Sequence, residues 1–127
     1  MTAETFITFS VIVAALQLIE SLNLYSGRGK LTAIAMAIST VEFIWLITCI
    51  YALFSISFPG WSIFLPAAFV SYFAVATWHS RHFTKDIENL DDAKELIIPK
   101  NLVLISLGFS AAHLVVSGLA WLQYVGA

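Results

Sequence analysis

Four long apolar runs constrain the fold of this chain more than any other feature. They cover about residues 6–25, 31–56, 61–80 and 102–124 of a 127-residue sequence. Each is close to the length of a membrane-spanning helix, about 17–25 residues. Lipid offers no partner to a free backbone group, so apolar spans of this kind form helices. The sequence therefore predicts an all-α, polytopic integral membrane protein, with a bundle of four transmembrane helices as a single domain over residues 1–127.

The composition supports the same fold class. Hydrophobic residues make up 60% of the chain and charged residues 11%, whereas soluble domains average about 45–50% and roughly 25%. A soluble domain of this size has too much surface per volume to bury so much apolar material. Lipid is therefore the predicted surrounding of the excess, and the formal net charge of -2 does not favour a nucleic-acid partner.

One polar segment, residues 79–100, separates the third apolar run from the fourth. It holds five of the eight acidic residues of the chain, and Phe83, Ile87, Leu90 and Ile97 recur in it at helical spacing. This pattern predicts a short amphipathic helix on the cytoplasmic surface. We interpret it as a solvated connector, and the alternative is a docking surface for a cytoplasmic partner.

The basic residues predict how the chain is oriented. All six lie in two loops, 26–30 and 79–100: they are Arg28, Lys30, Arg81, Lys85, Lys94 and Lys100. The positive-inside rule makes both loops cytoplasmic. With an even number of spans, both termini then lie outside. The short loops favour a prokaryotic inner (plasma) membrane.

Each apolar run also carries a stripe of small or polar residues at helical spacing. Helices pack in lipid through such stripes, which allow close approach and interhelical hydrogen bonds. The stripes are predicted to face inward, and their members are Ser10, Gln17, Glu20 and Ser21; Thr32, Ala35, Ser39, Glu42, Leu46 and Cys49; Ala67, Ser71, Ala74 and Trp78; and Val103, Ser106, Ser110, His113, Ser117 and Ala120.

Glu42 and His113 are the most informative members of these stripes. Both lie about 11 residues from the cytoplasmic start of their helices, or roughly 16 Å deep, near the midplane of the bilayer. They are predicted to pair, within a polar intramembrane cluster of Glu42, His113, Gln17, Glu20, Ser39 and Ser110. The cluster is either a proton-titrating or ligand-binding site, as intramembrane ionisable groups often are, or a satisfied polar pair that fixes helix register.

Other candidate sites are weaker. His79 and His82 are spaced to share one helix face and could ligate a metal, but His113 is too deep to join them. Cys49 is the single cysteine, so neither an intrachain disulfide nor a cysteine metal set is expected. Nothing in the pattern indicates a catalytic triad or a cofactor, and we expect a protein that is not an enzyme.

Three functions are compatible with these features. The first is a non-enzymatic membrane subunit or scaffold that packs against copies of itself or other membrane subunits, with lipid around it. The second is a small proton-coupled transporter or ion pathway that uses Glu42 and His113. The third is quinone or lipid binding within the bundle.

Overall fold

The structure, a computed structural model, is all-helical in the part of the chain it describes, residues 2–30, 32–84 and 98–126. Four helices lie close to the predicted positions: α1 (Ala3–Ser26), α2 (Ala33–Ser55), α3 (Phe64–Thr84) and α5 (Lys100–Tyr124). A short 3-10 helix, η1 (Gly60–Ile63), precedes α3. The four helical segments are each long and apolar enough to cross a membrane, which suggests a membrane location. The predicted amphipathic helix falls largely on residues 85–97, outside the described residues.

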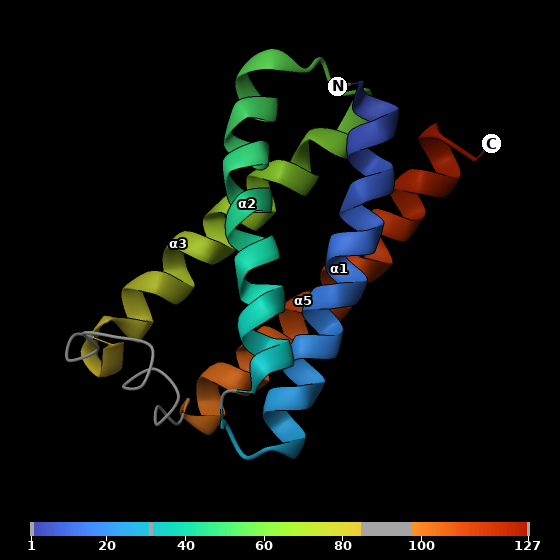
Figure 1. Cartoon of the computed structure of the whole chain (residues 1–127). Coiled ribbons are helices and arrows are strands. Elements are labelled where there is room, and N and C mark those ends of the chain that lie inside the picture. The colour runs from blue at the N-terminus through green and yellow to red at the C-terminus, as the bar shows by residue number, and fades with distance from the viewer. Residues whose placement is uncertain (1, 31, 85–97, 127) are drawn as a thin grey trace.

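The helices run alternately up and down, so that both ends of the chain lie at the same end of the bundle (Figure 1). We call this the termini end. The opposite end, called the loop end, carries residues 27–30 between α1 and α2. There the Ile98 N–H donates to the Gly29 carbonyl oxygen (2.9 Å), which fastens the start of α5 to this loop.

Threonine side chains begin the first two helices. Thr2 Oγ1 accepts from the Thr5 N–H (3.2 Å), and Thr32 Oγ1 accepts from the Ala35 N–H (3.1 Å). Each bond satisfies an amide that has no partner inside its helix. Thr32 Oγ1 also donates to Asn23 Oδ1 (2.8 Å), which joins the start of α2 to the end of α1.

The start of α3 differs from the prediction, because the chain first forms η1. Gly60 takes a φ of 53° after Pro59, and the Ser62 side chain and N–H both bond the Pro59 carbonyl oxygen (2.6 and 3.1 Å). Pro66 has no N–H to donate back to Ser62, so a regular α-helix cannot include that bond. The α-helical part therefore begins at Phe64 rather than near Trp61.

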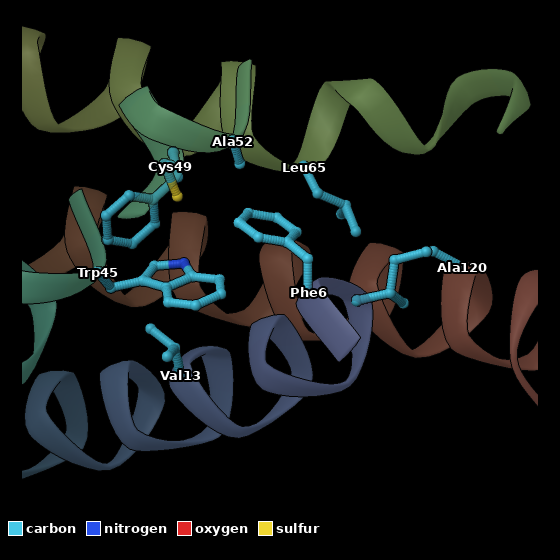
Figure 2. Close-up of a cluster of buried hydrophobic side chains, with 9 residues drawn as sticks. Phe6, Val13, Trp45, Cys49, Ala52, Leu65 and Ala120 are labelled. Atoms are coloured by element: carbon cyan, nitrogen blue, oxygen red, sulfur yellow. The ribbon is translucent and has the colours of Figure 1, made fainter. Parts of the chain in front are cut away.

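A compact apolar core lies toward the termini end. Its buried members are Phe6, Ile7, Val13, Trp45, Cys49, Ala52, Leu65, Phe69 and Ala120, and Figure 2 shows how side chains from all four helices meet there. The rings of Phe6 and Trp45 stack with centroids 4.6 Å apart. Trp121 Nε1 donates to Thr8 Oγ1 (3.2 Å) beside this core. The core closes this half of the bundle.

The loop end is more open. The most extensive packing joins α1 to α5, whereas α3 touches α5 only lightly, and α3 diverges from α1 and α5 toward its C-terminal end (Figure 1). Small polar residues allow the close α1–α5 approach: Ser21 Oγ lies 2.7 Å from Ser106 Oγ and 3.5 Å from Ser110 Oγ. A cavity lined by residues of all four helices lies near the loop end.

Candidate functional site

The deepest acidic group, Glu42, meets Glu20 rather than a histidine. The two carboxyl groups come from α2 and α1 and lie close to each other. Ser39 Oγ donates a 3.4 Å bond to Glu20 Oε2. Glu42 is only 9% exposed, and its Oε1 has no hydrogen-bond partner among the described residues. Two carboxyl groups this close resist carrying a negative charge at the same time, because like charges repel.

This carboxyl pair lies on the wall of a cavity of about 370 Å³. The cavity lies between α3 and the other three helices and extends to His79 and Ile98 at the loop end. Its remaining walls are mostly apolar, with aromatic rings of Tyr72 and Phe73 from α3. Pockets of roughly 300–1,000 Å³ hold small organic ligands. A cavity of this size could therefore bring water or a ligand to the pair.

Tyr72 was not identified from the sequence, and it shapes the cavity. Its ring stacks on Phe109 with centroids 3.9 Å apart and planes 2° apart. Ser106, Glu20 and Glu42 line the same cavity from the other helices. The one sequence signal for Tyr72 was its place in the middle of an apolar run, because a buried tyrosine hydroxyl usually has a polar partner.

His113 lies apart from the carboxyl pair. Its ring sits between Phe109 and Phe69, with centroid distances of 5.4 and 5.7 Å. Neither ring nitrogen has a hydrogen-bond partner among the described residues, although the side chain is only 4% exposed. The predicted Glu42–His113 hydrogen bond is therefore not formed. Equal depth on two helices does not bring side chains together when aromatic rings from α3 and α5 enclose one of them.

Further buried polar groups continue from this level toward the termini end. The contacts Ser21–Ser106 and Thr8–Trp121 fix an antiparallel register between α1 and α5. Gln17 and Ser10 are buried on α1, and His113 and Ser117 are buried on α5. Within the described part of the chain, atoms without a hydrogen-bond partner occur on Gln17 (Oε1), Ser10, Ser117, Trp45 and both nitrogens of His113. We call Gln17, His113, Ser10 and Ser117 the polar column.

Of the other predicted residues, Ser110 lies in the α1–α5 interface, where its hydroxyl donates to the Leu107 carbonyl oxygen (3.0 Å).

The small-residue stripe of α3 was predicted on the wrong face. Ser71, Ala74 and Trp78 are exposed, and Leu65 and Phe69 are buried instead. Leu65 and Phe69 face inward because they fill the apolar core that the four helices share near the termini end.

The predicted metal site is only partly described. His79 lines the cavity near the loop end, and the side chain of His82 lies outside the described residues. Among the described residues, no group of three or more His, Cys, Asp or Glu side chains is placed to hold a metal ion. The possible partner surface at 79–100 also falls mainly outside the described part.

Comparison with protein-family models, with curated proteins and with solved structures found no match to this chain. Its function is therefore inferred from the arrangement of side chains alone.

Proposed function

We propose that this chain is an integral membrane protein that provides a path for protons across the bilayer, with Glu20 and Glu42 as the groups that accept and release them. The observation that carries the proposal is the facing of these two carboxyl groups on the wall of a cavity. A pair that shares one proton can pass it on when water or a third group approaches. Ionisable residues at membrane depth mark such pathways.

The half of the path near the loop end is the cavity itself. It runs from Ser39 and Glu42 to His79 and Ile98, with space for water along that length. By the positive-inside rule this end is cytoplasmic, because Arg28 and Lys30 lie there. Both termini are then outside, in a prokaryotic inner membrane.

The half near the termini end is the polar column. Buried hydrogen-bonding groups in proteins are nearly always paired with protein or with ordered water. Gln17 and Ser10 are seven residues apart on α1, or roughly 10 Å along the helix, a span that bridging waters could connect. The apolar core around Phe6 and Trp45 covers the far end. We therefore expect protons to cross, and hydrated ions to be excluded.

The other two hypotheses stay predictions. A structural subunit or scaffold would pack against copies of itself or other membrane subunits. Quinone or lipid binding would use the same cavity, whose walls are largely apolar.

Proton flux into liposomes tests the proposal. Purified protein is reconstituted with an internal pH dye, and a potassium gradient with valinomycin sets the membrane potential. We expect flux well above empty liposomes. Glu42→Gln should lower it by roughly a hundredfold, because the amide cannot take up the proton that a general acid–base group transfers.

Two variants make this result interpretable. Glu4→Gln removes an exposed carboxyl group in the first turn of α1 and should leave the flux unchanged. Glu42→Asp retains the carboxyl group and should keep part of it. A Glu42→Gln protein that elutes as one symmetrical peak, reconstitutes normally and conducts like the unmodified chain would refute the proposal.

A further inference from the structure

The cavity has a second possible occupant besides water, and the chemistry of its walls defines it. We infer that the cavity is a binding site for organic cations, such as a flat amine or pyridinium with an apolar body. The site needs the carboxyl pair and the cavity walls, but it does not need proton conduction. It therefore adds a ligand to the proposed proton pathway.

The charge of the site selects a cation. Two carboxyl groups meet on the wall, and Glu42 Oε1 is buried without a partner among the described residues. Neither lysine nor arginine is among the described residues that line the cavity. The remaining titratable groups that line it are Tyr72 and His79, both from α3; α5 contributes none. An anion would meet acidic groups without a fixed positive charge to offset them.

The walls select an organic cation over an inorganic one. Hard metal cations require several oxygen ligands at close range, whereas most of this cavity is lined by aliphatic and aromatic side chains, among them Phe73, Leu102 and Ile105. A ligand with an apolar body would cover those side chains and direct its charge to the carboxyl pair. The volume of about 370 Å³ is at the small end of the range for organic ligands, roughly 300–1,000 Å³.

One wall is already in position for such a ligand. Tyr72 is held by its stack on Phe109, so little side-chain freedom is lost on binding. An aromatic ring near a bound cation adds attraction through its π face. The carboxyl pair would therefore bind the charged group of the ligand, and the ring of Tyr72 would contact its flat apolar body.

Dye binding to the purified protein in detergent tests this inference. The probe is a dimethylaminostyryl-pyridinium dye, a flat monovalent cation whose fluorescence rises in rigid apolar sites. We expect saturable binding that becomes about tenfold or more weaker in Glu42→Gln, as when one member of a charge pair is lost. Binding should also weaken as the pH is lowered, because protonation neutralises the carboxyl groups.

Matched measurements decide the result. Glu4→Gln should bind like the unmodified chain, and the anionic dye anilinonaphthalene sulfonate should not bind more weakly to Glu42→Gln. Glu20→Gln provides a second variant if Glu42→Gln does not fold. The inference is overturned if a folded variant binds the cation as tightly as the unmodified chain, or if both dyes respond alike. Because no proton gradient is present, this result is independent of the flux measurement.

Discussion

At the scale of single residues, the interior of this bundle is notable for polar groups without hydrogen-bond partners among the described residues. They include Glu42, Gln17 and His113. Left without any partner, such a group would cost about 1–3 kcal/mol, so we expect water or a ligand to bond to it. A polar pair that only fixed helix register would be expected to satisfy its own members. The unsatisfied groups therefore favour a site that exchanges protons or ligands over a structural pair.

Substitution of His113 tests this at one position. His113→Phe keeps a ring between Phe69 and Phe109 and removes two buried nitrogens, so the free energy of unfolding should rise by about 1–3 kcal/mol. The measurement is thermal or detergent-induced unfolding of the purified protein. Proton flux should fall at the same time, because the polar column loses a member.

His113→Ala serves as the contrast. It leaves a void between two rings and should lower the free energy of unfolding by roughly 2–5 kcal/mol. If His113→Phe destabilises the protein as strongly as His113→Ala does, the imidazole nitrogens have partners and the polar column is misassigned.

The sequence was informative about the depth of these residues but not about their contacts. Helix rise alone placed Glu42 and His113 near one level. Which groups meet depends on how the helices rotate and cross, and this is set by packing between residues far apart in the chain. The Glu20–Glu42 contact joins two residues predicted within the same cluster, but not the pair that was expected.

At the scale of elements, the connection between α1 and α2 is a fixed turn. Gly29 has a φ of 85° and donates its N–H to the Leu24 carbonyl oxygen (2.7 Å). A Cβ at Gly29 would collide with the carbonyl oxygen of Ile98. The adjacent Arg28 also has a positive φ, 57°, and its side chain is exposed.

Two substitutions in this turn should have opposite effects. Gly29→Ala should lower the free energy of unfolding by about 1–3 kcal/mol, because it adds both strain and a collision with backbone. Arg28→Gly should raise it by a few tenths to about 1 kcal/mol through relief of the left-handed conformation. Thermal unfolding measures both. A neutral Gly29→Ala would show that the turn does not pack against Ile98.

The existence of the four helices was predictable, because apolar runs of this length are a strong signal. The inward face of α3 was not. Small residues mark a face where helices approach closely, as on α5, where Ser110 and Ser117 are buried. On α3 the same rule selected Ser71 and Ala74, which are exposed, whereas the large side chains of Leu65 and Phe69 fill the apolar core.

At the scale of the whole molecule, the bundle has a closed half and an open half. The core around Phe6 and Trp45 closes the termini end, and the cavity opens the loop end as far as Glu42. Hydropathy predicts that both termini lie on one side, but it carries no information on which pair of helices separates. Because the cavity opens at the loop end and the apolar core closes the termini end, water can reach the carboxyl pair from one side of the bundle.

The central claim is that water reaches the carboxyl pair through this cavity from the loop end. The most direct measurement is labelling by a membrane-impermeant maleimide in sealed vesicles. All variants carry Cys49→Ala, which removes the single buried cysteine. The reporter is Ser39→Cys, because Ser39 lines the cavity and bonds Glu20. Arg28→Cys marks the loop end, and Thr2→Cys marks the termini end.

We expect the Ser39→Cys variant to be labelled from the same side as the Arg28→Cys variant and not from the side that labels the Thr2→Cys variant. Labelling should slow when the organic cation occupies the cavity. Labelling from the Thr2 side, or no labelling from either side in a protein that still folds, would contradict the account.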